Sequence, residues 1–354
     1  MLKVVTTHEA KPSPSLLDEW RGLLGDSDHA TPFQTPAWVT TWWKHFGKTK
    51  KPHWIEVREG SDLVGLYPLY LSNGPWRALR AIGTGQSDYL HPLSRQGYAN
   101  KVRDVIVEHA KQESQADLLD LHQLREDVIS MPESAEQAVC LTLDLPDSYD
   151  SYLKTLSKSL RYDCRRMDRS EVNESKAELR IIEADEARWG VRVLLDLHGK
   201  RWRKRGLPGA FATRQLRDFH MDAADALAHD GHLKMGVLKV DDRPAGAIYA
   251  MQTGKTRFFY QCGFEPEQKA LSPGTLLVAH SIRSAIDEGC TQFDFLRGDE
   301  PYKRRWKPQH ENRNLRYILP LNTGLGAIGK AYNDAGSRVE AKIRAKLEGR
   351  GFLK

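Results

Sequence analysis

The chain has 354 residues, of which 40% are hydrophobic and 28% charged, and its formal net charge at pH 7 is +6. This composition is typical of a globular protein with enough apolar residues for a core, and the length suits two domains. The longest apolar run, Leu63–Leu71, is too short to cross a bilayer, and residues 1–15 contain no apolar segment of the signal-peptide kind. We therefore expect a cytoplasmic protein whose excess positive charge suits an anionic ligand, an anionic membrane surface or nucleic acid.

The cysteines argue against a metal centre, because none of the four has the close paired spacing of metal ligands. We predict reduced, mostly packed thiols at Cys140, Cys164, Cys262 and Cys290. Cys164 stands among arginines in RYDCRR, a setting that would lower a thiol pKa, so a catalytic thiol there stays open. We expect no metal site and no permanently bound cofactor.

The first half of the chain predicts a hairpin, a strand, a helix and a strand. Alternating apolar residues on both sides of a Gly-Ser-Asp turn predict a hairpin over Trp54–Leu71. The pattern then predicts a strand over Leu79–Gly83, a helix over Ala99–Ser114 and a buried strand over Ala116–Leu124. A basic stretch follows, with predicted helices within Ser151–Val172 and Arg188–Gly206.

The second half repeats this order. A hairpin is predicted over Met235–Met251, a strand over Thr256–Phe264, a helix over Thr275–Glu288 and a strand over Thr291–Leu296. Two segments with the same order of elements favour an α/β protein, or an α+β protein with a mixed sheet, built from two similar halves. The predicted division is 1–150 for the first half, 151–322 for the second, and 323–354 for a helical tail.

The second-half helix has a start that suits an anion. Ser272 is a favourable N-cap residue, Pro273 suits the first helical position, and Gly289 suits the end. A helix N-terminus presents N–H groups and partial positive charge to a phosphate. An ordinarily capped helix without a ligand explains the same residues.

The longest distinctive segment, FYQCGFEPEQKALSPGTLLVAHSIRSAIDEGCTQFDFLRGDEPYKRRW, resembles GNAT-superfamily acyltransferases of the CelD/BcsL type. TPFQTPAWVTTWWKHFG, IGTGQSDYLHPL, SKSLRYDCRR and LHGKRW resemble the same family, so the resemblance covers about Phe33–Trp306. It implies two GNAT-like halves packed side by side, related to the Fem-type ligases, with acyl-CoA as co-substrate and an amine as acceptor. It also implies that Ser272, Gly274 and Thr275 bind the donor.

The chain departs from the usual GNAT pattern at one point. Typical members bind the CoA pyrophosphate with a loop that has two glycines, whereas this chain has Pro273 and one glycine, Gly274. Fem-type relatives use aminoacyl-tRNA as donor, and so that donor stays open.

Acyl transfer to an amine requires a base for the amine, a donor for the developing oxyanion, and a proton for the leaving thiolate. The segment RGDEPYKRRW supplies residues of each kind directly after a strand. Asp299 or Glu300 is a candidate base and Tyr302 a candidate acid, while Arg297 and Lys303 are candidates to bind phosphate or orient the carboxylate. A solvated charged turn is the alternative explanation.

Three further groups are candidates. His198 in LHGKRW is a possible base near neutral pH, with Arg201 and Trp202 beside it as substrate-binding residues. Arg161 is a candidate ligand of phosphate, and Asp88 and Tyr89 are candidates to line a cleft between the halves. Each of these also fits an ordinary structural role.

The tail Arg338–Lys354 has six basic and two acidic residues, with Val339, Ile343 and Leu347 at helical spacing. This pattern predicts a basic amphipathic helix, either packed on a domain or in contact with an anionic membrane.

Three functions remain open from the sequence. The first is an acyl-CoA-dependent N-acyltransferase of the cell envelope, whose acceptor is a lipid amine, as in sphingolipid formation, or an amino sugar of an exopolysaccharide. The second is a Fem-like ligase that uses aminoacyl-tRNA, and the third is a non-catalytic regulator that binds a nucleotide. Under the first, no nucleic acid partner is expected.

Overall fold

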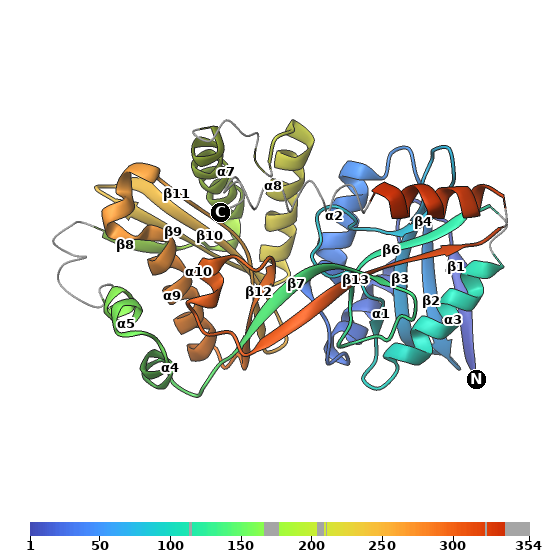
Figure 1. Ribbon diagram of the computed structural model, residues 1–354, viewed down its shortest axis with the longest axis horizontal. Coiled ribbons are helices and arrows are strands. Elements are labelled where there is room, and N and C mark those ends of the chain that lie inside the picture. Colours follow the sequence, from blue (N-terminus) through green and yellow to red (C-terminus); the bar gives the residue numbers. More distant parts are fainter. Residues whose placement is uncertain (113–114, 166–176, 204–208, 210, 323, 337–354) are drawn as a thin grey trace. The chain divides into compact units, whose positions relative to one another are not determined.

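The computed structural model describes residues 1–112, 115–165, 177–203, 209, 211–322 and 324–336 (Figure 1). Two compact units divide the chain. Unit 1 contains Met1–Val39, Phe46–Ala138 and the described residues from Arg313 onward, and unit 2 contains Thr40–His45 and Val139–Asn312. Among the helices in these ranges, none combines the length and hydropathy needed to cross a bilayer.

Unit 1 is a mixed sheet with the strand order β1-β2-β3-β4-β6-β13, and the short β5 pairs with β3. The strands are β1 (Leu2–Thr7), β2 (Lys51–Glu59), β3 (Asp62–Leu71), β4 (Ala78–Ala81), β5 (Leu93–Ser94), β6 (Leu118–Arg125) and β13 (His310–Pro320). The helices are α1 (Pro14–Gly25), α2 (Pro36–Phe46), of which Thr40–His45 belong to unit 2, α3 (Ala99–Lys111) and residues 325–336. Its main core joins one face of the sheet to α3, through Val102 and Ile106 of the helix and Val57 and Leu119 of the strands.

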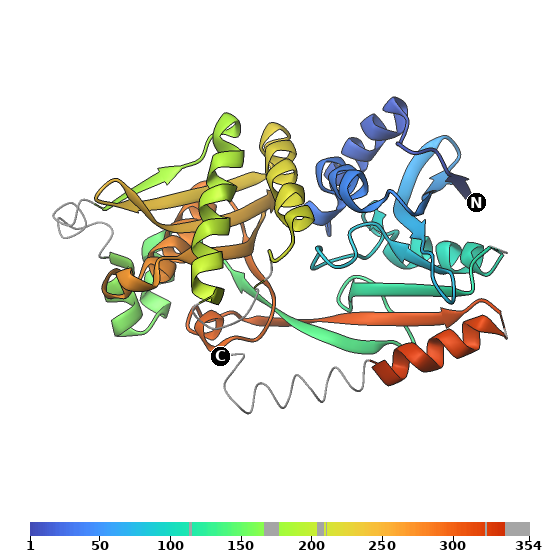
Figure 2. The same cartoon turned by 90° about the horizontal axis from the view of Figure 1, so that it is seen from above.

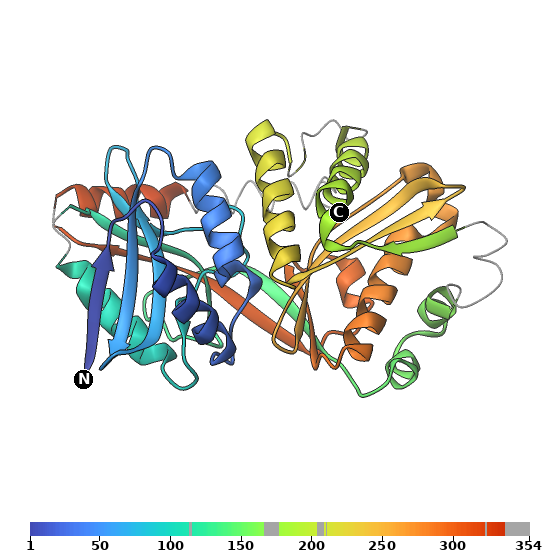
Figure 3. The same ribbon diagram turned by 180° about the vertical axis from the view of Figure 1, so that it is seen from behind.

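The strands of unit 2 follow the order β8-β9-β10-β11-β12-β7, again with mixed directions. The strands are β7 (Ala135–Asp144), β8 (Ala177–Ile181), β9 (Leu233–Val240), β10 (Arg243–Thr253), β11 (Thr256–Phe264) and β12 (Gln292–Arg297). The helices are α4 (Tyr149–Thr155), α5 (Lys158–Arg165), α7 (Ala187–Arg203), α8 (Arg214–His229), α9 (Pro273–Asp287) and α10 (Pro301–Arg304). Helices α7 and α8 cover one face of this sheet, and α4, α5 and α9 cover the other (Figures 2 and 3).

The predicted repeat is confirmed at the level of elements. Apart from the two-residue β5, unit 1 has the order β2-β3-β4-α3-β6, and unit 2 has the order β9-β10-β11-α9-β12. In both units the last two strands of this series are parallel, with Ala78 paired to Leu118 and Thr256 paired to Gln292. The prediction of a mixed α/β fold is therefore confirmed.

Each sheet is completed by a strand from the other part of the sequence. β7 follows β6 in the chain, but residues Cys140–Asp144 pair with β12. β13 follows the elements of unit 2, but residues Asn314–Pro320 pair with β6. The compact units therefore begin and end at other residues than the predicted ranges 1–150, 151–322 and 323–354. The predicted helix over Arg338–Lys354 lies outside the described residues.

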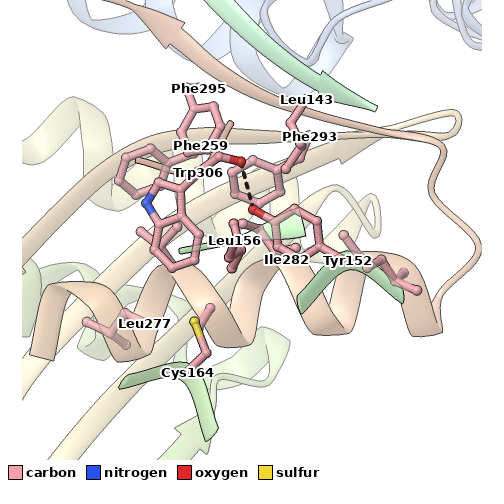
Figure 4. Close-up of a cluster of buried hydrophobic side chains, with 14 of the residues drawn as sticks. Leu143, Tyr152, Leu156, Cys164, Phe259, Leu277, Ile282, Phe293, Phe295 and Trp306 are labelled. Atoms are coloured by element: carbon pink, nitrogen blue, oxygen red, sulfur yellow. Dashed lines mark hydrogen bonds between the residues drawn. The ribbon is translucent and has the colours of Figure 1, made fainter. Parts of the chain in front are cut away.

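The core of unit 2 lies between its sheet and α4, α5 and α9 (Figure 4). Phe259, Phe293 and Phe295 of the strands meet Ile282 of α9 there, and the Tyr152 hydroxyl donates a 2.9 Å hydrogen bond to the Trp306 carbonyl. Cys164 is part of this cluster, and burial raises the pKa of its thiol to about 11. The idea that neighbouring arginines lower the pKa of Cys164 is therefore wrong, because the thiol faces the core.

Candidate active site

The parallel strands β11 and β12 part soon after they begin. Their pairing joins Thr256 to Gln292, Arg257 to Phe293 and Phe258 to Asp294. Beyond these residues β11 continues to Phe264 along β10, while β12 continues along β7. The second half of β11 and the end of β12 therefore diverge, and the segments that follow both strands start from this opening.

Irregularities in both strands accompany the divergence. The register between β10 and β11 shifts after Tyr249, which leaves Tyr260 as an extra residue in β11. The register between β12 and β7 shifts between Asp294 and Arg297, and Leu296 has a φ of 56° within this interval. The Leu296 N–H donates a 2.7 Å hydrogen bond to Asp294 Oδ1, which stabilises the bend. β-Bulges bend a strand and redirect its side chains, and they are frequent beside active sites.

Helix α9 starts where β11 and its connecting turn end. Ser272 holds the N-cap position, as predicted, but its φ is 50° and its side chain makes no capping hydrogen bond. The position is therefore as predicted, but the Ser272 side chain does not cap α9. The N–H groups of Thr275 and Leu276 donate to the Ser272 carbonyl at 2.9 and 3.1 Å, and Pro273 has no N–H. These two N–H groups of the first turn are therefore already hydrogen-bonded within the chain, and fewer N–H groups remain to bind an anion.

Gly274 is a position of close approach. A Cβ there would lie 3.3 Å from Cε1 of Phe264, the last residue of β11. The missing side chain thus lets the end of β11 and the start of α9 pack together.

The loop after β12 is held by a buried lysine. Lys303 has a side chain only 4% exposed, and its Nζ lies 2.9 Å from Glu300 Oε2. The same Nζ donates to the carbonyls of Arg297 and Gly298 at 2.6 and 3.2 Å. Gly298 has a φ of 111°, and a Cβ there would lie 2.5 Å from the Glu300 carboxylate. Lys303 therefore fastens the loop, an arrangement that leaves its ammonium group little capacity to bind a phosphate.

The two carboxylates of this loop are both ion-paired. Asp299 Oδ2 accepts a 2.8 Å hydrogen bond from Arg304, which also pairs with Glu311, and Glu300 pairs with Lys303. The hydrogen bond from Arg304 holds the pKa of Asp299 below its usual value. A lowered pKa makes Asp299 a weak base for an ammonium group.

Tyr302 lies beside the point where the strands part. Its ring is 43% exposed, and its centroid lies 6.5 Å from that of Phe259, the first residue of β11 beyond the parallel pairing. Tyr302 is thus both accessible to solvent and adjacent to the opening.

His198 and Trp202 meet on the other face of the sheet. The Trp202 Nε1–H donates a 2.7 Å hydrogen bond to His198 Nε2, and His198 is 4% exposed. This contact assigns the imidazole a proton on Nδ1 and a lone pair on Nε2. Gly263 of β11 allows the approach of α7, because a Cβ there would lie 3.1 Å from the His198 backbone nitrogen. The Arg201 side chain lies outside the described part of the structure.

Beside this pair is an aromatic cluster that the sequence did not indicate. His220 of α8 lies with its ring 4.9 Å from Phe211 and 5.6 Å from Tyr260, the extra residue of β11. Burial lowers the pKa of His220 to about 3. Tyr249 is fully buried 5.4 Å from Tyr260, and within the described residues its hydroxyl has no hydrogen-bond partner. The register shift that brings these rings together has no signature in the sequence.

The remaining predicted residues belong to other elements. Arg161 donates to the carbonyls of Lys154 and Leu156, both at 3.1 Å, and so caps the end of α4. Asp88 and Tyr89 are buried residues of unit 1, and the Arg125 guanidinium lies over the Tyr89 ring at 5.0 Å. Their role at a cleft between halves stays a prediction. In the described ranges no group of three or more His, Cys, Asp or Glu side chains is arranged to hold a metal ion.

The comparisons with known proteins define the class of fold. Residues 158–304 match the family model described as "Acetyltransferase (GNAT) domain". This range runs from α5 to α10 and includes the divergent strands, the start of α9 and the loop after β12. Unit 2 therefore contains the fold of a GNAT domain. No curated protein matches the chain.

Solved structures extend the likeness to most of the chain. The crystal structure of FemX has a TM-score of 0.64 and 11% identity, and the match covers 89% of this chain and 97% of that one. The C-terminal domain of a putative lysylphosphatidylglycerol synthetase from Agrobacterium fabrum has a TM-score of 0.55 and 11% identity, with 89% and 94% covered. L-PGS from Bacillus licheniformis has a TM-score of 0.55 and 13% identity, with 90% and 95% covered. At such identities these likenesses concern the fold alone.

Proposed function

We propose that the protein is an N-acyltransferase that moves an acyl group from acyl-CoA to a primary amine of a cell-envelope precursor. The divergence of β11 and β12 within the segment that matches the GNAT domain carries this proposal. The pantetheine arm of acyl-CoA is an extended chain with amide groups, and such a chain can lie along an open strand as an added strand does. The finer assignment to the CelD/BcsL type is part of the same proposal.

The start of α9 is the proposed binding site for the pyrophosphate. Its partial positive charge attracts an anion, and Gly274 lets this start of the helix lie close to the end of β11. Ser272 and Thr275 flank this position, and Arg297 at the end of β12 is the proposed further source of positive charge in the same unit.

Tyr302 is the proposed acid. The amine attacks the thioester carbonyl, the C–S bond breaks as the C–N bond forms, and the Tyr302 hydroxyl gives its proton to the leaving thiolate. The accessible position of Tyr302 beside Phe259 supports this role.

His198 is the proposed base; it lies on the opposite face of the sheet from Tyr302, so the two residues can act on one substrate only through the opening between β11 and β12. The ion pairs of Asp299 and Glu300 make these carboxylates weaker candidates. His198 Nε2 accepts a hydrogen bond from the neutral indole N–H of Trp202, and a substrate ammonium is a stronger hydrogen-bond donor that can replace it. Trp202 and Arg201 on the same helix would then contact the acceptor.

The experiment is a thiol-release assay with acetyl-CoA and palmitoyl-CoA, using a long-chain amino alcohol and an amino sugar as acceptors, with the product mass measured. Tyr302→Phe should lower kcat on the order of 10²-fold, because general acid catalysis contributes about that much. Tyr162→Phe is the matched control, since Tyr162 is a similarly exposed tyrosine of α5, 49% exposed against 43% for Tyr302. Equal rates for the two variants would remove Tyr302 from the mechanism.

An aminoacyl-tRNA-dependent ligase is the second candidate. The start of α9 favours this function, because Pro273 has no N–H and the N–H groups of Thr275 and Leu276 already donate to a backbone carbonyl. Few N–H groups then remain there for a CoA pyrophosphate. Binding of charged tRNA that weakens steeply with added salt, together with no turnover of any CoA thioester, would favour this function over the first. Tight nucleotide binding without turnover of either donor would indicate the non-catalytic regulator.

A further inference from the structure

The helix over residues 325–336 lies beside the strands of unit 1 (Figure 2). Its glycines make close contacts there. A Cβ on Gly329 would lie 2.8 Å from Leu118 Cδ1 and 2.9 Å from Trp76 Cγ. A Cβ on Gly326 would lie 2.4 Å from the Asp117 carbonyl oxygen. Asn333 on the same side accepts a 2.9 Å hydrogen bond from Arg316 of β13. The glycine side of this helix therefore faces the sheet.

The large apolar side chains of the helix lie about 100° round from its glycines, on a face exposed to solvent. Leu325, Ile328 and Tyr332 are 49%, 61% and 67% exposed, and spacings of three and four residues place them on one helical face. An amphipathic surface helix normally turns such residues to the core, whereas here they are exposed to solvent. We call Leu325, Ile328 and Tyr332 the outer stripe.

An aromatic pair extends the outer stripe. The ring of Tyr332 lies 5.1 Å from the half-buried Trp76, which precedes the exposed Arg77 in the loop before β4. Trp and Tyr side chains with one apolar and one polar end are enriched at membrane–water interfaces.

The sequence beyond the helix continues the same pattern. Val339, Ile343 and Leu347 follow Tyr332 at intervals of seven, four and four residues, so a helix over Arg338–Lys354, as the sequence predicts, would prolong the outer stripe. That segment has six basic and two acidic residues, which is complementary to an acidic surface. The three exposed side chains alone are far too few for a stable dimer, which buries about 800 Å² per partner.

We propose that the outer stripe docks this protein on the surface of an anionic lipid bilayer, with Leu325, Ile328 and Tyr332 inserted among the headgroups. The basic residues that follow supply attraction to acidic lipids, and the apolar side chains supply the burial that holds the protein there. This inference concerns where the protein binds and stands independently of the acyl donor and of catalysis.

The test is co-sedimentation of the full chain with phosphatidylcholine vesicles, with and without phosphatidylglycerol. We expect binding to the acidic vesicles, and a loss of about tenfold or more in the double variant Ile328→Asn, Tyr332→Asn, since each large apolar group contributes through its buried area. The matched control is Ile181→Asn, Tyr162→Asn, because these residues are 51% and 49% exposed in unit 2, away from the stripe.

Three results would overturn the proposal. One is no binding of the unchanged protein to acidic vesicles, and another is equal binding of the stripe variant and the control. The third is a stable dimer in sedimentation velocity that the stripe variant dissociates, because the stripe would then be an interface between copies. Thermal unfolding of both variants keeps a folding defect separate from a loss of binding.

Discussion

Lys303 shows how one residue can differ in role from what its sequence context predicts. A lysine in a charged segment normally reaches into solvent, but this one is buried against the carbonyls of Arg297 and Gly298. The sequence YKRR does not distinguish the buried cation from its neighbours, because the direction of a side chain depends on the turn at Gly298. The residue types of the site were predictable, and their partners were not.

Replacing Lys303 tests this structural role. Lys303→Met should lower the free energy of unfolding by about 1–3 kcal/mol, since it leaves buried carbonyl groups without their donor. Lys307→Met, outside this contact, should change it by less than about 0.5 kcal/mol, as surface substitutions do. Urea unfolding of both variants gives the comparison. Equal stabilities would mean that the lysine does not fasten the loop.

His220 predicts a pH dependence of stability. Its pKa falls from the ordinary 6.5 to about 3 because the ring is buried. As pH falls through this interval the unfolded chain binds a proton at His220 and the folded protein does not, so stability decreases by up to about 1.4 kcal/mol per pH unit.

The variant His220→Phe removes this titrating group. The free energy of unfolding should then fall less between pH 6 and pH 4, as measured by urea unfolding at several pH values. The aromatic neighbours Phe211, Tyr249 and Tyr260 accommodate a ring of similar shape. A slope unchanged from the original protein would show that His220 is protonated in the folded state over that range.

At the level of elements, periodicity located the strands and helices well. The hairpin at Trp54–Leu71 and the strand Thr256–Phe264 appear as expected, because alternating burial fixes them locally. The divergence of β11 and β12 was not predictable, since it depends on the register between strands far apart in sequence. The same limit applies to the helix over residues 325–336, whose buried side consists of glycines rather than apolar residues.

The packing of that helix gives a matched pair of substitutions. Gly329→Ala should destabilise unit 1 by about 1–3 kcal/mol, because the added Cβ would press on Leu118 and Trp76. Gly336→Ala, with nothing within 4 Å of the added atom, should leave stability unchanged or raise it by about 0.5–1 kcal/mol. Thermal unfolding compares the two. A neutral Gly329→Ala would mean that the helix does not pack closely on the sheet.

At the level of the whole molecule, β7 and β13 each pair with a strand that lies far away in the sequence. Leu141 and Leu143 of β7 are fully buried in the core of unit 2 although they follow the elements of unit 1. The repeat was visible in the order of elements, but pairings of this range leave no local pattern in the sequence.

Fragments test where unit 2 begins and ends. A fragment of residues 139–312 should unfold cooperatively, whereas residues 151–322 should not, because that fragment lacks β7 and exposes Phe293 of β12. Circular dichroism during heating distinguishes them. A cooperative transition in the 151–322 fragment would show that β7 is dispensable for the fold.

The central claim is that unit 2 binds an acyl-CoA thioester at the divergence of β11 and β12. The most direct measurement is calorimetry of the full chain with acetyl-CoA, palmitoyl-CoA and free CoA, repeated with Gly274→Leu and with Gly22→Leu, an open helical position of unit 1, as control. The account predicts micromolar binding that Gly274→Leu abolishes and Gly22→Leu preserves. No binding of any of the three ligands to the unchanged protein would contradict it.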